Sequence, residues 1–314
     1  MKKIIALALA LVMLASLAAC GSDGKYHVGI CQLVQHPALD AATQGFQDAL
    51  TEQLGDKVVF DLQNASGEPT NCTTIINGFV SSKVDLIMAN ATPALQAAAA
   101  ATDSIPILGT SVTDYASALE LDNWNGTVGG NISGTSDLAP LDGQAAMIKE
   151  LFPDAKTVGI LYCSSEANSQ YQVDVITGYL TEMGFTVTPY SFTDTNDVAS
   201  VAQKACDSDV IYIPTDNTAA SNTEAIANVV LPAGVPVVAG EAGICQGCGV
   251  ATLSISYYDL GYATGLMAAK VLTGEAKISE MPVQYAPEFT KQYNAANCDA
   301  LGITIPGDYT PLEG

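Results

Sequence analysis

The sequence contains no arginine: all 11 of its basic residues are lysines, against 33 aspartates and glutamates, for a net charge of −22. This absence removes the guanidinium group, the side chain best suited to hold a carboxylate or phosphate with two parallel hydrogen bonds. The acidic balance also argues against nucleic acid as a partner, because binding it relies on a basic surface. An anionic group on a ligand would therefore be held by hydroxyl groups, backbone N–H groups, helix N-termini or one of the few lysines.

Catalytic signatures are missing as well. The sequence has no G-x-x-x-x-G-K-[ST], G-x-G-x-x-G, G-x-S-x-G or H-E-x-x-H motif. It has only two histidines, His27 in a predicted strand and His36 before a predicted helix, so a Ser-His-Asp site would have to use one of them. The segment from Leu121 to Ile132 lacks the first and last ligands of a calcium loop. The sequence therefore predicts no enzyme activity, no metal site and no cofactor.

The first residues of the chain predict export. A basic start is followed by an almost wholly apolar run over residues 4–19, which is too short to span a bilayer. The run ends in Leu17-Ala18-Ala19-Cys20, which resembles a bacterial lipobox. The resemblance implies that residues 1–19 are a signal peptide, that Cys20 is lipidated, and that residues 20–25 tether the protein to the outer face of a bacterial cell membrane. A plain secretory signal with an unrelated cysteine is the alternative.

Seven further cysteines remain after Cys20, and only Cys245 and Cys248 lie close together in the sequence. A zinc site would need two more ligands, and no second such pair or nearby histidine supplies them. A local disulfide and two free thiols are both open for this pair, ahead of catalytic redox chemistry. The other cysteines are expected to be small buried hydrophobic residues; they are Cys31, Cys72, Cys163, Cys206 and Cys298.

Strand and helix patterns alternate along the first part of the chain. Short β-branched runs predict strands over residues 27–33, 56–62, 84–89 and 105–111. Between them, apolar periodicity and Pro37 and Pro93 predict helices over residues 38–54, 70–82 and 93–102. This alternation predicts a parallel sheet with helices on both faces.

The pattern then repeats. A Val-Gly-Ile strand core occurs at Gly29 and again at Gly159, and in each case a proline-containing strand follows at the same interval, at Pro106 and Pro236. We therefore expect a duplicated lobe, that is, an α/β fold of two similar doubly wound parallel-sheet lobes joined by a multi-strand hinge. The expected N-terminal lobe comprises residues 26–135 and 255–281, and the C-terminal lobe residues 136–254 and 282–314. A single-lobe enzyme with a decorating repeat is the alternative. A helix over 257–272 is expected to return to the first lobe, and the Gly- and Asn-rich segment 123–134 is expected to form part of the hinge.

One turn in each lobe has the sequence pattern of a ligand-binding site. The strand Val210–Ile213 is stopped by Pro214, and four polar residues then open a helix-like segment, Thr215–Thr218, that continues toward Ile226. The segment 84–93 has the same form. In an open α/β sheet, ligands bind where strands end and helices begin. Two such turns facing each other would clamp a ligand.

Several of these segments together resemble one protein family. They are Gln32–Asp40, Ala91–Ala94, Gly130–Asp137, Pro214–Thr218 and Tyr258–Gly261. In order and in both lobes, they are similar to the ABC-transporter substrate-binding lipoproteins with a type I periplasmic-binding-protein fold, of the kind associated with tryptophan and tyrosine uptake. The resemblance runs from about Tyr26 to Ile303. It implies an extracytoplasmic protein that captures a small molecule and passes it to a membrane permease. The Cys245–Cys248 segment departs from the family pattern close to the expected pocket.

The resemblance favours an aromatic amino acid as the ligand. The expected ligand-binding residues lie at strand ends and crossovers; they are Gln32, Thr92, Thr110, Ser111, Asp137, Asn168, Asp216, Asn217 and Glu241. We expect the three hydroxyl groups to hold the ligand carboxylate and a carboxylate to pair with the ammonium, with Asp216 as first choice. A helix N-cap is the alternative role for Asp216. A sensory or enzymatic module on the same scaffold, and a surface adhesin that has lost its pocket, are the alternative functions.

Overall fold

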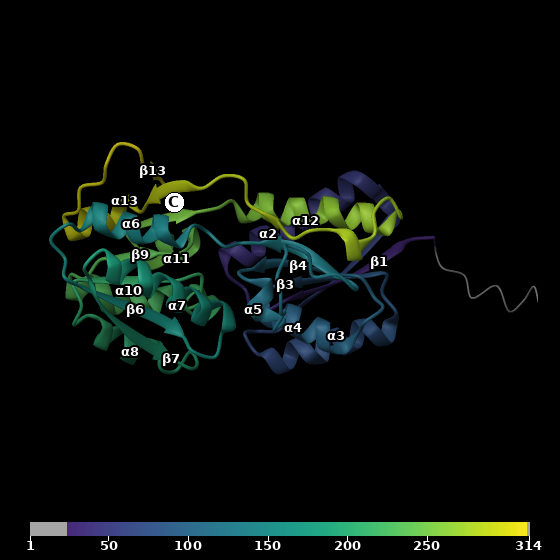
Figure 1. Cartoon of the computed structure of the whole chain (residues 1–314), viewed down its shortest axis with the longest axis horizontal. Coiled ribbons are helices and arrows are strands. Elements are labelled where there is room, and N and C mark those ends of the chain that lie inside the picture. The colour runs from purple at the N-terminus through teal and green to yellow at the C-terminus, as the bar shows by residue number, and fades with distance from the viewer. Residues whose placement is uncertain (1–23, 313–314) are drawn as a thin grey trace, which may run out of the picture.

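The computed structural model describes residues 24–312 and has two lobes side by side (Figure 1). The predicted signal peptide, the lipidation site at Cys20, most of the predicted tether, and residues 313–314 lie outside the described residues. Within the described part, none of the helices combines the length and the apolar character that a bilayer span requires.

The first lobe is built on a six-stranded parallel sheet with the order β11-β5-β4-β3-β1-β2. Its strands are β1 (Tyr26–Gln32), β2 (Val58–Asn64), β3 (Leu86–Asn90), β4 (Ile107–Val112), β5 (Ile132–Ser136) and β11 (Gln284–Tyr285). Its helices are α2 (Pro37–Leu54), α3 (Pro69–Ser82), α4 (Thr92–Ala101), α5 (Tyr115–Ala118) and α12 (Tyr257–Leu272), with short 3-10 turns η1 (Gly55–Lys57) and η2 (Ile278–Glu280).

The second lobe has a seven-stranded sheet with the order β13-β12-β10-β9-β8-β6-β7, parallel except where β10 meets β12. Its strands are β6 (Thr157–Cys163), β7 (Thr186–Phe192), β8 (Val210–Ile213), β9 (Val237–Ala239), β10 (Ala251–Ser254), β12 (Thr290–Tyr293) and β13 (Thr310–Pro311). Its helices are α6 (Leu141–Leu151), α7 (Ala167–Glu182), α8 (Val198–Ala205), α9 (Asn217–Ala220), α10 (Thr223–Ala233), α11 (Ala242–Cys248) and α13 (Ala295–Leu301).

The two sheets share one topology, which confirms the predicted fold class. The order β5-β4-β3-β1-β2 in the first lobe matches β10-β9-β8-β6-β7 in the second. The glycines of the repeated strands have a packing reason. A side chain at Gly29 would overlap the Phe79 ring, and one at Gly159 would overlap the Ser208 hydroxyl and crowd the Tyr190 ring. Helices cover both faces of each sheet, and apolar clusters fill the four layers between helices and sheets.

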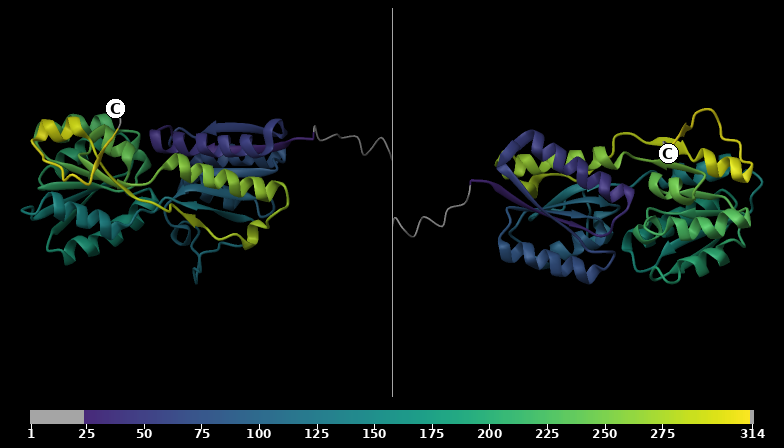
Figure 2. Two further views of the ribbon diagram at one scale, coloured as in Figure 1. Left: turned by 90° about the horizontal axis from the view of Figure 1, so that it is seen from above. Right: turned by 180° about the vertical axis from the view of Figure 1, so that it is seen from behind.

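The chain crosses between the lobes three times, after β5, after β10 and after β11 (Figures 1 and 2). The third crossing lies later than expected. Gln284 and Tyr285 pair with Thr135 and Ser136 of β5, so these residues extend the first sheet beyond the expected boundary between residues 281 and 282. The helix expected to return to the first lobe is α12. It packs against α2 of that lobe, which confirms the expected return.

Two local expectations are corrected. The second strand begins at Val58 rather than Asp56, because the chain first makes the 3-10 turn η1 after α2. The helical segment after Pro214 is not continuous to Ile226. It divides into α9 and α10, and both the Asn222 N–H and the Asn222 side chain bond back to carbonyls of α9, at Ala219 and Thr218.

Candidate ligand-binding cleft

The carboxyl ends of the first-lobe strands carry strained backbone. Ala91, after β3, has φ of 89°, and Ser111, in β4, has φ of 53°. Residues other than glycine rarely adopt such angles, at a cost of about 1–3 kcal/mol each, and they cluster where a protein contacts a ligand. Ala91 is the N-cap residue of α4, so its backbone conformation determines the direction in which the chain enters the first turn of this helix.

Buried polar atoms without a hydrogen-bond partner gather at the same place. Within residues 24–312, six buried side-chain atoms have none: His36 Nδ1, Asn90 Oδ1, Thr92 Oγ1, Ser111 Oγ, Asn168 Oδ1 and Thr252 Oγ1. Each such atom costs about 1–3 kcal/mol when it stays unpaired. All but Thr252 lie at or just after the end of β1, β3, β4 or β6. A polar ligand between the lobes would satisfy such atoms.

Three predicted residues are among these unpartnered groups. Thr92 and Ser111 are 2% and 6% exposed, and their hydroxyl groups are unbonded. Asn168 is also buried, and its Oδ1 is unbonded although its Nδ2 donates to Glu166 Oε2 at 3.1 Å. The geometry therefore leaves two hydroxyl groups of the first lobe and one amide oxygen of the second available to a ligand.

Two predicted residues point into the first lobe instead. The Thr110 hydroxyl bonds the Thr135 hydroxyl at 3.1 Å, which in turn bonds that of Thr264 in α12 at 2.8 Å. Gln32 donates to Asp40 Oδ1 at 2.6 Å and accepts from the Thr43 hydroxyl at 2.7 Å. The polar groups of both side chains are used in hydrogen bonds within the first lobe, so they hold the strand ends in place and are not free to bond a ligand.

Asp216 is a helix N-cap, which is the alternative role considered for it from the sequence. Its Oδ1 accepts the Ala219 N–H at 2.8 Å, which caps α9. Its Oδ2 accepts the Cys163 N–H at 2.6 Å and the Ser169 hydroxyl at 2.7 Å. Burial, and secondarily Glu166, raises the pKa of this carboxyl. All these donors belong to the second lobe, so the cap that the sequence allowed is present, and the contact of Asp216 with a ligand ammonium stays a prediction.

Glu241 and Asp137 are also engaged. Glu241 caps α11 by accepting the N–H groups of Gly243 and Ile244, and burial raises its pKa to about 7. Asp137 accepts from Thr113 Oγ1 at 3.0 Å and from the Tyr257 hydroxyl at 2.9 Å. Burial raises the pKa of Asp137 as well. Since Asp137 and Tyr257 flank two of the three crossings, their bond ties the hinge strands together.

Glu166 organises the second-lobe side of the cleft, although the sequence did not single it out. Its carboxylate accepts five hydrogen bonds, from Asn168 Nδ2 and from the backbone N–H and side chain of both Asn217 and Thr218. Asn217 in turn lies 3.3 Å, through its Oδ1, from Nε2 of His36 in the first lobe. The two lobes are thus joined directly across the cleft.

The repeat contained a signal for these missed residues. His36 lies seven positions after Gly29, and Glu166 lies seven positions after Gly159. Each is the N-cap residue of the helix that follows its strand, yet neither side chain caps that helix. Aligning the two lobes would have placed both side chains at the cleft. Asn90 and Tyr257 carried no comparable signal.

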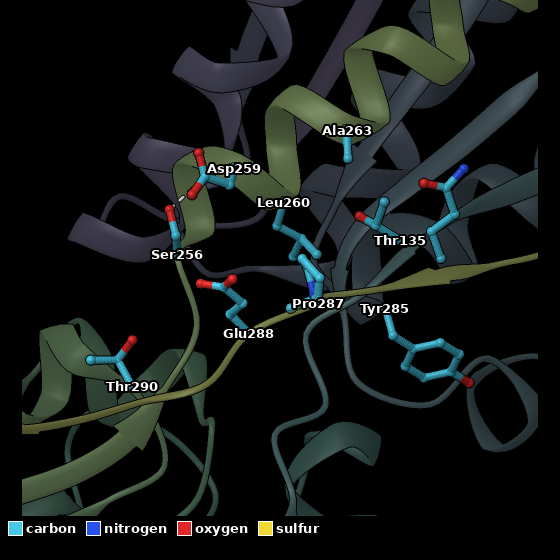
Figure 3. A pocket seen from close by; sticks show the side chains of 11 residues that line it. Thr135, Ser256, Asp259, Leu260, Ala263, Tyr285, Pro287, Glu288 and Thr290 are labelled. Atoms are coloured by element: carbon cyan, nitrogen blue, oxygen red, sulfur yellow. Dashed lines mark hydrogen bonds between the residues drawn. The ribbon is translucent and has the colours of Figure 1, made fainter.

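Two pockets lie near the lobe boundary. One, of about 250 Å³, opens at the cleft and is lined from both lobes by residues that include Glu68, Pro93, Glu166 and Asn217. A larger one, of about 430 Å³, lies at the hinge and is lined by residues that include Leu260 and Pro287 (Figure 3). The hinge pocket contains none of the predicted ligand residues, whereas the cleft pocket contains Asn217. Neither pocket is lined by the six unpartnered groups, but Thr92 and Asn168 are next in sequence or hydrogen-bonded to residues that line the cleft pocket, Pro93 and Glu166, so the cleft is the better candidate site.

Cys245 and Cys248 are free thiols, buried in α11. Every cysteine among residues 24–312 is free. Burial raises the pKa of the Cys248 thiol, which disfavours the reactive thiolate. These two side chains are buried in the apolar cluster between one face of the second sheet and helices α8 and α10.

The fold and the cleft together define a two-lobed solute-binding protein of the type I periplasmic-binding-protein class. The family described as ABC transporter substrate binding protein matches residues 27–310, and the chain belongs to that family. Proteins of this family are extracytoplasmic and bind solutes. The chain is 35% identical over 286 residues to a tyrosine-binding protein of Clostridioides difficile (strain R20291), covering 90% of this chain and 82% of that protein.

Two solved structures bear on the conformation. A Streptococcus pneumoniae ABC domain in complex with L-Trp is 35% identical, covers 90% of this chain and 96% of its own, and superposes with a TM-score of 0.86. The ligand-free, open structure of a Clostridium difficile substrate-binding protein with adhesive properties is 37% identical, covers 92% and 99%, and gives a TM-score of 0.70. The two proteins are about equally identical to this chain, so the difference between the two TM-scores indicates that the lobes here are arranged more as in the L-Trp complex than as in the open structure.

Proposed function

We propose that this protein captures an aromatic amino acid in the cleft between its lobes and delivers it to an ABC permease. The observation that carries the proposal is the set of five buried, unpartnered polar atoms at the strand ends of both lobes. A folded protein tolerates such atoms at a considerable cost unless a ligand satisfies them. The similarity to a tyrosine-binding protein and to a complex with L-Trp supports an aromatic ligand.

The site suits a zwitterion. The ligand carboxylate would lie against the hydroxyl groups of Thr92 and Ser111 and the N-terminus of α4, where hydroxyl and N–H groups replace the absent arginine. The ammonium would be held by oxygen and nitrogen acceptors nearer the second lobe, where Asn168 Oδ1 is available. Asp137, Asn217 and Glu241 would act beside it as parts of the cleft wall, as would Asp216 through the α9 cap.

A ligand screen tests this proposal. Purified protein lacking residues 1–19 is heated with each of the 20 amino acids and with representative sugars and nucleosides, and the melting temperature is recorded. A ligand that binds only the folded state raises the melting temperature by mass action. We expect tyrosine, tryptophan or phenylalanine to give the largest rise. A rise with sugars alone would contradict the ligand class, and no rise with any compound would contradict solute capture.

The lipid anchor at Cys20 belongs to the same proposal. Its basis is the lipobox-like segment Leu17–Cys20, and one or more acyl chains at this residue would hold the protein on the outer face of the membrane, near its permease. Expression of wild-type and Cys20→Ser chains in a bacterium that lipidates such signals tests it. We expect the wild type in the membrane fraction and the variant in the soluble extracytoplasmic fraction. Equal distribution of the two would contradict the anchor.

Adhesion is a second candidate function, and one comparison favours it: a relative that is 37% identical is described as having adhesive properties. The test is attachment of protein-coated particles to cultured host cells, with and without saturating tyrosine or tryptophan. Specific attachment above that of particles coated with an unrelated acidic protein would support the second function.

A further inference from the structure

His36 occupies an unusual position for the N-cap residue of a long helix. It precedes α2, but its side chain makes no capping hydrogen bond. The imidazole is 7% exposed and lies between the lobes, with Nε2 3.3 Å from Asn217 Oδ1 of the second lobe. Nδ1 is buried and has no partner. One ring nitrogen is therefore used across the cleft and the other is unused.

The surrounding hydrogen bonds determine which nitrogen carries the proton. Asn217 Nδ2 donates to Glu166 Oε2 at 2.7 Å, and the Asn217 backbone N–H donates to the same oxygen at 3.0 Å. This orients the Asn217 amide so that its oxygen, which cannot donate, faces His36. His36 must then donate from Nε2. In the neutral ring Nδ1 is consequently a bare acceptor with its lone pair buried.

The neutral ring agrees with its environment. Burial lowers the pKa of His36, and this outweighs the opposing effects of its bond to Asn217 and of the negative charges of Glu166 and Asp40. Nδ1 is therefore a neutral acceptor close to the contact between the two lobes, and a ligand N–H group bound there would supply its missing donor.

Asn168 provides a second acceptor beside it. Its Nδ2 donates to Glu166 Oε2, the oxygen that also accepts from Asn217. Asn168 and Asn217 are therefore neighbours around one carboxylate oxygen, and the unpartnered Oδ1 of Asn168 belongs to the same cluster as His36. The cluster therefore holds two buried acceptors without a hydrogen-bond donor, His36 Nδ1 and Asn168 Oδ1.

We propose that His36 is both the latch that holds the lobes closed and an acceptor for the ligand's α-ammonium group, with Nε2–H bonded to Asn217 and Nδ1 receiving a ligand N–H. This inference rests on the proposed function and deepens it, because it assigns recognition of a primary amine to a residue outside the expected ligand set. An amino acid then favours closure by filling the acceptor that closure buries, which links binding to lobe movement.

The test combines two variants with two ligands. Calorimetry measures the affinity of the protein for L-tryptophan and for indole-3-propionate, which lacks the amine, and for L-tyrosine and its deamino analogue. His36→Gln keeps an N–H able to reach Asn217 but removes the ring acceptor. His36→Asn keeps an acceptor near the position of Nδ1 but is too short to reach Asn217. His27→Gln is the control, because His27 is exposed at the amino end of β1, away from the strand ends that form the site.

The expected results separate the two roles. His36→Gln weakens amino-acid binding about 10- to 100-fold and leaves the affinity for the deamino ligand at the wild-type value, because only the amine uses Nδ1. His36→Asn weakens both ligands and speeds their dissociation, because the latch is lost. His27→Gln changes neither. Melting temperatures of the ligand-free variants verify folding.

Two outcomes would overturn the inference. If His36→Gln weakens the amino acid and its deamino analogue by the same factor, or weakens neither, Nδ1 does not hold the amine. A wild-type protein that binds no aromatic amino acid would refute the proposed function itself, and this inference with it. The first result leaves the proposed function intact, so the two failures are distinguishable.

Discussion

Thr92 and Thr110 test the assignment of the site most sharply, because the sequence treats them alike and the structure separates them. The perturbation is the same at each position: threonine to valine, which keeps the shape of the side chain and removes the hydroxyl group. At Thr92 the hydroxyl is buried and unpartnered. At Thr110 it bonds Thr135 at 3.1 Å inside the first lobe.

The magnitudes follow from these partners. Thr92→Val removes no existing hydrogen bond, so the ligand-free melting temperature should stay within about a degree or two of the wild type or rise slightly. Losing a bond to the ligand carboxylate should weaken binding by about 1.5–3 kcal/mol, or roughly 10- to 150-fold. Thr110→Val breaks an internal bond worth about 0.5–1.5 kcal/mol, which corresponds to a fall of about 1–6 °C, with little change in affinity.

Calorimetry with the best ligand of the screen, and thermal unfolding without ligand, measure the two quantities for both variants. The expected pattern is reciprocal: Thr92→Val loses affinity and keeps stability, and Thr110→Val loses stability and keeps affinity. Wild-type affinity in Thr92→Val would remove that hydroxyl group from the site. A large loss of affinity in Thr110→Val, without loss of stability, would show that the site lies on the other side of the strand from the one described.

Three further changes probe the fold and its charges. Burial raises the Glu241 pKa from 4.5 to about 7, so between these values the folded state holds a proton that the unfolded state has released. The free energy of unfolding should therefore fall from about pH 5 to pH 8 in the wild type, and fall less in Glu241→Gln. Thermal unfolding at a series of pH values measures this, and the same pH dependence in both proteins would contradict it. Gly261→Ala should destabilise the protein by about 1–3 kcal/mol, because a methyl group would overlap the Ala42 carbonyl of α2. Gly178 lies in α7, and a methyl group there would meet no neighbouring atom, so Gly178→Ala should be neutral or stabilising by up to about 1 kcal/mol. Equal melting temperatures for Gly261→Ala and Gly178→Ala would refute the tight contact between α2 and α12. Asp216→Ala should lower the free energy of unfolding of the ligand-free protein more than Asp114→Ala, because buried Asp216 accepts three internal hydrogen bonds and half-buried Asp114 accepts one, from Ser117. Urea titration measures both free energies, and a smaller loss at Asp216 would contradict its structural role.

The duplicated fold was predictable because its evidence is repeated along the chain. Gly29 and Gly159 lie in equivalent strands, and the strands that begin just after Pro106 and Pro236 pair with their neighbours in the same order. The alternation of strands and helices predicts parallel sheets, whereas the order of the strands comes from the structure alone. The late third crossing was not predictable, since β11 has two residues and its pairing with β5 depends on the tertiary arrangement.

The site was predictable only in outline. Strand ends were identified correctly, and of the hydroxyl groups expected there, those of Thr92 and Ser111 are free. Thr110 and Ser111 were both expected to hold the ligand carboxylate, although neighbouring side chains of a strand point to opposite faces. Only the Ser111 hydroxyl is without a partner, and the positive φ of Ser111 has no sequence signature. For Asp216, the sequence allowed a cap or a ligand contact. The Ala219 N–H makes the cap to Oδ1, and nothing in the sequence indicated that Cys163 and Ser169 would donate to Oδ2.

Calorimetric titration with tyrosine, tryptophan, phenylalanine and leucine shows whether the cleft between the lobes binds one aromatic amino acid. We expect saturable binding of at least one of the three aromatic amino acids with a stoichiometry near one per chain. We also expect Thr92→Val and His36→Gln to weaken this binding and His27→Gln to leave it unchanged. Tightest binding of leucine, or binding of an aromatic amino acid that none of the cleft substitutions affects, would contradict aromatic amino-acid binding in the cleft.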